Sequence, residues 1–173
     1  SFIKTSSDTD EMNIIEEFGR SPAGFPLFPF NKQAIRAYSE RICRDKISGA
    51  LSFNPRSLIR HLLLENLKVY RDKYIKGCYP PANLGGISCP SSLEQNIRSS
   101  VHNDQFRAVS LAAIWGFGAK SIAELASCVT SNMARVFNID DLAHELERTT
   151  PVKPKPGSYT QKPTSRSKSK PSS

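Results

Sequence analysis

The sequence predicts an all-α protein, an irregular bundle of five to seven helices followed by a disordered basic tail. Two observations predict the helices. Apolar residues recur at three- and four-residue steps, and capping residues such as Asn31, Asn54 and Ser121 precede these segments. A third observation argues against a sheet, because the extended apolar pieces near Phe25 and Ile87 are short and marked by proline.

We expect three regions along the chain: residues 1–19 with one short helix, residues 20–150 as a helical domain, and residues 151–173 as a tail. At 173 residues the chain is long enough for one domain with a hydrophobic core. The tail contains five prolines and almost no apolar residue, so it cannot bury enough surface to offset its chain entropy. Because the sequence begins without methionine and ends in this tail, we expect it to be part of a longer chain.

The basic charge is concentrated in the tail. The chain has a formal net charge of +8, and residues 1–150 carry only +2 of it, from 18 basic and 16 acidic side chains. The charge of the helical domain therefore does not by itself predict nucleic-acid binding. We expect the tail to act as a solubilising spacer or to contact phosphate backbones weakly. Its basic residues are Lys153, Lys155, Lys162, Arg166, Lys168 and Lys170.

The sequence contains no run of about 18 apolar residues, so we expect no transmembrane helix. The N-terminal residues also have no signal-peptide pattern, and a cytoplasmic protein with reduced thiols is expected. Cys78 and Cys89 flank a loop at a separation of eleven residues and have no CxxC spacing. Cys43 and Cys128 lie in predicted helices as small apolar residues. We therefore expect no metal site.

Three elements are predicted before the centre of the chain. Asp8 or Thr9 is expected to cap a short first helix. Residues 20–30 contain three prolines, so we expect their aromatic side chains to pack across the helical body as an extended strap. Asn31 is then expected to cap a helix over residues 32–47, whose apolar residues form one stripe.

The longest predicted helix runs from Pro55 to about Lys76. Asn54 is a strong N-cap, because its side-chain oxygen can accept from the free amides of the first turn. Pro55 occupies the first helical position, where its missing N–H costs nothing. The expected apolar face consists of Leu58, Ile59, Leu62, Leu63, Leu67, Tyr70 and Tyr74.

The C-terminal half is predicted to contain four further helices, after a proline- and glycine-rich loop over residues 77–90. Phe106 and Trp115 are expected to point inward from the second of these helices. The four are residues 91–99, residues 104–115 with Asn103 as cap, residues 121–137 with a capping box of Ser121 and Glu124, and a short helix capped by Asp140.

Arg56 stands in the first turn of the central helix, where the helix dipole makes a cation unfavourable unless an anion lies in front of it. A helix N-terminus combined with an arginine is a natural phosphate site. The alternative is that Arg56 is solvated or pairs with one of the 16 carboxylates. The sequence contains no GxxxxGK[ST] phosphate loop, so another domain would hold most of a nucleotide.

The segment NPRSLI at residues 54–59, with FPFN upstream at residues 28–31, resembles the helical lid of AAA-type and STAND-type P-loop ATPases. In that family a first lid helix follows a "PF" segment, and a second lid helix opens with "NPR". The resemblance is closest to large bacterial ATPases of anti-phage defence, including those that act with DNA-phosphorothioation restriction systems. It covers roughly residues 20–140, where Tyr79-Pro80 and Trp115-Gly116 match a later loop and helix end.

The resemblance implies that Arg56, presented by the Asn54-capped helix, senses the γ-phosphate of a nucleotide. It implies ATP and Mg²⁺ as ligands of a P-loop core domain, in the same longer chain or in a partner subunit. The P-loop, the Mg-holding acidic residues and the sensor strand are missing from the sequence, so these residues are not expected to hydrolyse ATP alone. The lid would move with nucleotide state and relay that motion.

Two other hypotheses come from the residues themselves. Residues 104–115 and 121–137, joined by a Gly-Phe-Gly turn, could form a helix-turn-helix that binds DNA, although Glu124 and the low number of cations weigh against it. The other hypothesis is a structural helical adaptor, since no spacing supports hydrolytic or redox catalysis. The candidate nucleic-acid contacts are Lys120, Ser121, Thr130, Asn132, Arg135, Lys153, Lys155 and Lys168.

Overall fold

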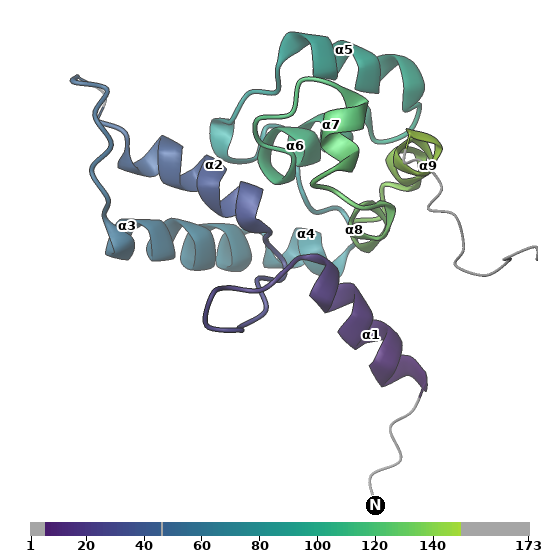
Figure 1. The fold of residues 1–173 in the computed structure, drawn as a ribbon, viewed down its shortest axis with the longest axis horizontal. Helices are drawn as coiled ribbons and strands as arrows, with labels where there is room; N and C mark the ends of the chain where they lie inside the picture. The colour runs from purple at the N-terminus through teal and green to yellow at the C-terminus, as the bar shows by residue number, and fades with distance from the viewer. Residues whose placement is uncertain (1–5, 46, 150–173) are drawn as a thin grey trace, which may run out of the picture.

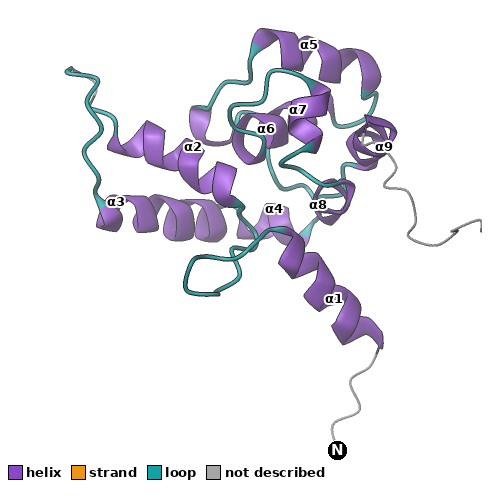
Figure 2. Cartoon of the chain, viewed as in Figure 1, coloured by secondary structure: helices purple, strands orange, loops and turns teal. Residues whose placement is uncertain are grey.

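The computed structural model describes residues 6–45 and 47–149, and the regular structure of these residues is helical (Figures 1 and 2). Nine α-helices, one π-helical segment and one 3-10 turn follow one another in the described ranges. Two isolated antiparallel bridges join Arg20 with Pro26 and Arg44 with Leu51. The all-α prediction is confirmed. None of the described helices has the length and apolar content needed to span a membrane.

The described helices form a projecting hairpin and a compact group. Figure 1 shows that α2 lies alongside α3 and η1 in the hairpin, whereas α5 to α9 cluster together. The helix α1 packs on α8. In chain order the elements are α1 (Ser6–Glu17), α2 (Lys32–Cys43), α3 (Pro55–Ile59), the π-helical η1 (Arg60–Lys68), α4 (Arg71–Ile75), the 3-10 turn η2 (Leu84–Gly86), α5 (Ser91–Ser100), α6 (Gln105–Trp115), α7 (Ile122–Ala126), α8 (Ser131–Val136) and α9 (Asp140–Thr149).

The hydrophobic core is centred on α6, which contacts both α2 and α5. Trp115, the last residue of α6, is fully buried and lies among aromatic rings. Its ring stacks on Phe30 with centroids 6.1 Å apart and lies 5.0 Å from the ring of Phe137. Its indole Nε1 donates a hydrogen bond of 2.8 Å to the carbonyl oxygen of Pro29. One side chain thus joins the strap, α6 and the end of α8.

Asn31 is buried where the strap meets α2, and its side chain satisfies three backbone groups at once. Its Oδ1 accepts a 2.8 Å hydrogen bond from the N–H of Ala34, which confirms the predicted N-cap of α2. Its Nδ2 donates to the carbonyl oxygens of Trp115 at 2.9 Å and Cys128 at 3.1 Å. Carbonyls at helix ends have no partner within their own helix, so Asn31 supplies the missing donors.

Arg107 on α6 holds the loop after α4 in place. Its guanidinium donates to the carbonyl oxygens of Gly77 at 3.1 Å, Tyr79 at 2.9 Å and Phe137 at 2.5 Å. It also pairs with Asp104 at 3.1 Å. A planar guanidinium can serve several acceptors in fixed directions, which a lysine cannot do. The loop that carries Tyr79 is therefore anchored to the core through its backbone.

Two predicted helices are divided in the structure, which is why the described helices outnumber the five to seven expected. The segment 55–76 is divided into α3, η1 and α4, with a turn at Tyr70 between η1 and α4. Within η1, Asn66 is buried and its Nδ2 donates to the carbonyl oxygen of His61 at 2.8 Å. The segment 121–137 is divided into α7 and α8. Thr130 is the N-cap of α8, because its Oγ1 accepts from the N–H of Met133 at 3.2 Å.

The strap prediction is correct for its second half only. Phe30 is buried and Phe28 is partly buried against the core. Phe25 is 70% exposed, so its prediction as a packed residue is wrong. It lies at a tight turn in which its carbonyl oxygen accepts from the N–H of Ser21 at 2.8 Å. The hydrogen bonds of this turn join residues 21–25 to one another, and the ring of Phe25 stays exposed.

Two helix boundaries near the N-terminus differ from the prediction. The helix α1 begins at Ser6, so Asp8 and Thr9 lie inside it and do not cap it. The helix α2 ends at Cys43 and does not reach residue 47. The chain turns there because the carboxylate of Asp45 accepts from the N–H groups of Ile47 and Ser48, at 2.9 and 2.6 Å.

The start of α6 also differs from the prediction. Asn103 is not its cap, because Asp104 stands at that position with a left-handed φ of 56° and makes no side-chain cap bond. The N–H of Asn103 donates instead to the carboxylate of Asp141 at 2.8 Å. Phe106 is exposed and lies under the guanidinium of Arg98, with 4.7 Å between the Cζ atom and the ring centroid. Its predicted inward position is therefore wrong.

We predict that Asn31→Ala lowers the free energy of unfolding by about 3 kcal/mol, since it removes one cap and leaves two buried carbonyls unpaired. Asn54→Ala, which removes an exposed N-cap of the same type, is the matched control and should cost about 1 kcal/mol. Urea unfolding followed by circular dichroism measures both. Equal losses in the two variants would contradict the central role of Asn31.

Asp141 should make folding sensitive to acid. Hydrogen bonds, first of all from the backbone N–H of Asn103, hold the pKa of Asp141 below its ordinary value. A carboxyl with a lowered folded-state pKa stabilises the fold above its unfolded pKa, and that contribution is lost as the pH falls through the folded pKa. We predict that Asp141→Asn makes the decline of unfolding free energy below about pH 4 shallower than in the wild type. The neighbouring Asp140→Asn is the control, and an equal change in both would refute the assignment.

Candidate functional site

The predicted nucleotide-sensing residues lie at the free end of the hairpin, where α3 begins (Figure 1). Asn54 has extended backbone angles, and its Oδ1 accepts from the N–H of Ser57 at 3.1 Å. Pro55 follows at the first helical position. The cap and the proline predicted from the sequence are both present, and they place Arg56 in the first helical turn.

Arg56 is exposed to solvent. Its guanidinium forms no hydrogen bond or ion pair with any residue of the described ranges, whereas Arg36, Arg44 and Arg98 each pair with a glutamate. A cation beside the positive end of a helix is electrostatically unfavourable in the absence of an anion. The arrangement leaves Arg56 available to an anionic group outside the described residues.

Large exposed apolar side chains flank Arg56 in the sequence. Phe53 is 72% exposed, Ile59 56% and Leu63 49%. Ile59 lies one α-helical turn after Arg56, and Leu63 lies in the π-helical η1 that follows, where it is also exposed. We call the set of Phe53, Arg56, Ile59 and Leu63 the α3 surface. An arginine within apolar side chains is a composition typical of protein interfaces.

The α3 surface is uncovered because one neighbour helix packs against this part of the chain. The helix α2 contacts α3 and η1 and buries Leu58 and Leu62. Ile59 and Leu63 point away from that contact and stay exposed, so the prediction of a single buried face is wrong for these two residues. Residues 55–68 therefore carry apolar side chains on two faces. Within the described ranges, α2 covers the face with Leu58 and Leu62.

The residues predicted to contact nucleic acid have other partners in the structure. The Thr130 hydroxyl and the Asn132 amide both donate to the carboxylate of Glu17 on α1. Arg135 pairs with Glu147 on α9 at 2.6 Å. These contacts hold α1, α8 and α9 together, so a structural role accounts for all three residues.

The remaining candidate contacts are divided between the helical domain and the tail. Ser121 caps α7, with its Oγ accepting from the N–H of Glu124 at 3.2 Å. Lys120 is exposed, and its N–H donates to the Glu124 carboxylate at 2.9 Å. In the predicted capping box the Glu124 carboxylate accepts from the N–H of Ser121, whereas in the structure it accepts from the N–H of Lys120, one residue earlier. Lys153, Lys155 and Lys168 lie outside the described residues, as does the predicted tail.

Metal ligands are not grouped in the described part of the chain, where no three of its His, Cys, Asp and Glu side chains could hold an ion together. The four cysteines are free thiols. Cys43 is buried, Cys78 is exposed, and Cys89 and Cys128 are half-buried. Burial, with a contribution from Glu94, raises the pKa of the Cys89 thiol to about 11.

A cavity at the other end of the hairpin was missed from the sequence. It lies where η1 and α4 meet the strap and is lined mainly by aromatic and aliphatic side chains, among them Phe28, Tyr74 and Tyr79. The sequence predicts Tyr74 on the buried face of a helix and Tyr79 in a loop, and neither prediction indicates a cavity. Tyr70, Tyr74 and Tyr79 are closely spaced in the sequence, but they line a cavity only because the strap lies across them.

No family model, curated protein or solved structure matches the chain.

We predict that Cys78 reacts first with iodoacetamide near pH 8, and that Cys89 and Cys128 react much more slowly. The thiolate is the reactive form, and burial raises the pKa values of Cys89 and Cys128. Mass spectrometry of peptides after timed alkylation measures the order. Cys78→Ser should remove the fast phase and Cys89→Ser should leave it; a fast phase that survives Cys78→Ser would refute the assignment.

Proposed function

We propose that this chain is a helical lid that docks on a P-loop ATPase core, with the α3 surface facing the nucleotide. One observation carries the proposal. Arg56 is exposed, is unpaired within the described ranges, and projects from a capped helix start amid uncovered apolar side chains. The NPR pattern at residues 54–56 supplies the link to ATPase lids. Because residues 20–140 resemble ATPases of bacterial anti-phage defence, we propose that the lid acts in such a defence system.

The proposed division of labour follows from charge. Arg56 supplies one positive charge for a γ-phosphate, and phosphoryl transfer also needs a phosphate cradle and a magnesium site. The core domain provides those, whether it belongs to the same polypeptide or to a partner subunit. ATP and Mg²⁺ are therefore ligands of the assembled ATPase, and the lid alone neither holds nor hydrolyses the nucleotide.

The apolar part of the α3 surface explains how the lid would stay docked. Burying Phe53, Ile59 and Leu63 against the core would remove exposed apolar area from water, at about 25 cal/mol per Å². The unpaired guanidinium would lie at the centre of that contact, where its charge is least screened. Docking and sensing would then be coupled, because the same face performs both.

The helix-turn-helix hypothesis stays a prediction without a supporting contact in the described ranges. The predicted recognition helix is two short helices, and Thr130, Asn132 and Arg135 bind other parts of the chain. The adaptor hypothesis shares the exposed apolar side chains of the α3 surface. It differs in giving Arg56 no role in nucleotide turnover.

We predict that Arg56→Ala lowers the ATP turnover number of the ATPase containing this lid by about 10²-fold, as expected for loss of one charge-stabilising group. Arg56→Lys should retain part of the activity. The matched control is Arg36→Ala, because Arg36 is an exposed arginine on α2 that pairs with Glu40. Steady-state hydrolysis assays on the assembled protein measure all three.

The apolar part of the surface is tested by Leu63→Glu. Leu63 is half exposed, so the melting temperature of the isolated chain should change little, whereas turnover of the assembled ATPase should fall because docking is lost. Turnover that is unchanged in both Arg56→Ala and Leu63→Glu would reject the lid and leave the adaptor.

A further inference from the structure

Charge is unevenly distributed within the helical part of the chain. Residues 32–76, which form the hairpin and α4, contain 11 basic and 4 acidic side chains, a net charge of +7. Residues 1–31 and 77–150 together contain 7 basic and 12 acidic side chains, a net charge of −5. The small net charge of residues 1–150 therefore conceals a strongly basic segment, which includes the projecting hairpin of Figure 1.

The arginines outside this basic segment have carboxylate partners. The five that the structure describes there all form ion pairs, namely Arg20, Arg98, Arg107, Arg135 and Arg148. Each partner belongs to the same chain and is close in sequence. The charge of these arginines is thus balanced locally, and they are not available to an external anion.

The cations of residues 60–76 are different. Arg60, Lys68, Arg71, Lys73 and Lys76 are all exposed, and we call these five residues the basic face. None of their side chains forms a hydrogen bond or an ion pair within residues 6–45 and 47–149. Residues 60–76 contain only two carboxylates. The basic face therefore carries an excess of positive charge that contacts within the described ranges do not neutralise.

Two cations of the basic face lie on the side of η1 that points away from α2. Leu62 and Asn66 are buried, and the Asn66 Oδ1 accepts from the hydroxyl of Tyr38 on α2 at 2.8 Å. Arg60 and Lys68 each stand two positions from one of these buried residues, which is about half a turn of a π-helix. Packing of α2 on η1 therefore directs both side chains into solvent.

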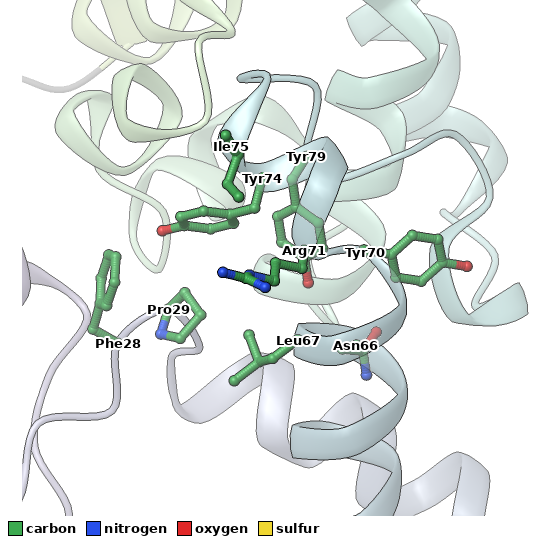
Figure 3. Close-up of a pocket in the computed structure, with 9 residues that line it drawn as sticks. All are labelled: Phe28, Pro29, Asn66, Leu67, Tyr70, Arg71, Tyr74, Ile75 and Tyr79. Carbon is green, nitrogen blue, oxygen red and sulfur yellow. The ribbon is translucent and has the colours of Figure 1, made fainter.

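Arg71 continues the basic face into α4. Figure 3 shows its guanidinium on the side of the chain opposite Tyr70, and no carboxylate is among the labelled side chains around it. A guanidinium presents several N–H donors in a fixed plane, and phosphate oxygens match that geometry. Lys73 and Lys76 follow in α4 and at its C-cap. The five cations thus extend along two successive helices.

We propose that the basic face binds the phosphate backbone of a nucleic acid. A nucleic acid is a polyanion with a condensed layer of counterions, and each cation that contacts a phosphate releases counterions and adds to the affinity. A row of exposed, unpaired cations is suited to that contact. The proposal goes beyond the ATPase lid and does not depend on it, because no residue of the basic face belongs to the α3 surface.

The residue types favour nucleic acid over an acidic protein. Three of the five cations are lysines, a residue that is depleted at protein–protein interfaces. Exposed ion pairs between proteins also contribute little free energy, whereas contacts with a phosphate backbone gain from counterion release.

The order of side chains also argues against a membrane surface. A helix that lies on a membrane separates an apolar face from a charged face. Leu64, which is 55% exposed, stands midway between Arg60 and Lys68, so this side of η1 mixes the two kinds of residue.

The test measures nucleic-acid binding by the full chain, with its six basic residues after residue 150 changed to glutamine so that they cannot bind in place of the helices. Fluorescence anisotropy is recorded with labelled duplex DNA, single-stranded DNA and duplex RNA of equal length, at about 50 to 200 mM salt. We expect binding to at least one of them, with a slope of log affinity against log salt of about −3 to −4. The three probes show which form of the backbone is preferred.

The double variant Arg60→Gln/Lys68→Gln, made in the same chain, locates the contact. It should weaken binding about 10-fold at the lowest salt and make the slope shallower by about 2, because two phosphate contacts are lost. Lys120→Gln/Arg148→Gln is the matched control, since it removes the same charge from exposed positions outside residues 32–76. The control should change the affinity by no more than about twofold. Circular dichroism checks that both variants are folded.

Four results would overturn the proposal. They are no salt-dependent binding to any of the three probes, equal losses in the two double variants, competition by polyglutamate as effective as that by unlabelled nucleic acid at equal charge concentration, and equal or tighter binding to phosphatidylglycerol vesicles that Arg60→Gln/Lys68→Gln abolishes. The third result would assign the basic face to an acidic protein, and the fourth would assign it to a membrane.

Discussion

The amide of Asn31 is the point at which separate parts of this chain are joined. Its oxygen caps α2, and its nitrogen donates to the carbonyl oxygens of Trp115 and Cys128, at the ends of α6 and of the segment after α7. Each of these three groups lies at a helix end and would otherwise be buried without a partner. One side chain therefore fixes where the strap ends and how α2 lies against α6.

The rest of the hairpin follows from that junction. Because the strap is fixed at Asn31 and by the Trp115 hydrogen bond to Pro29, Phe28 and Pro29 lie against η1 and α4. Arg107 fixes the opposite wall by binding the backbone of the loop that carries Tyr79. The two walls are set independently by the core, so the space between them is a consequence of how the core is anchored. At the free end of the hairpin, α2 packs on one face of α3 and η1, and Ile59 and Leu63 on the other face stay exposed.

Most arginines of the described residues fall into two groups by their partners. Arg20, Arg98, Arg135 and Arg148 pair with glutamates at exposed positions, and pairs of this kind contribute little to stability. Arg107 is largely buried and binds backbone carbonyls, so its role is structural. Arg41, Arg56, Arg60 and Arg71 form no side-chain hydrogen bond or ion pair within the described ranges. Arg56 and Arg71 lie at opposite ends of residues 55–75, and both are exposed and close to apolar side chains.

The sequence by itself determined the helical class, the caps at Asn31, Asn54 and Ser121, and the exposed position of Arg56, because these features depend on neighbours within one or two turns. Only the tertiary structure decided the rest. Apolar spacing marks Leu58 and Ile59 alike, and packing of α2 buries the first and leaves the second exposed. Asn103 has the residue type of a cap, yet Asp141, distant in the sequence, takes its N–H. The Tyr79 cavity exists because the strap crosses residues that follow it by about forty positions, and no local pattern encodes such a contact.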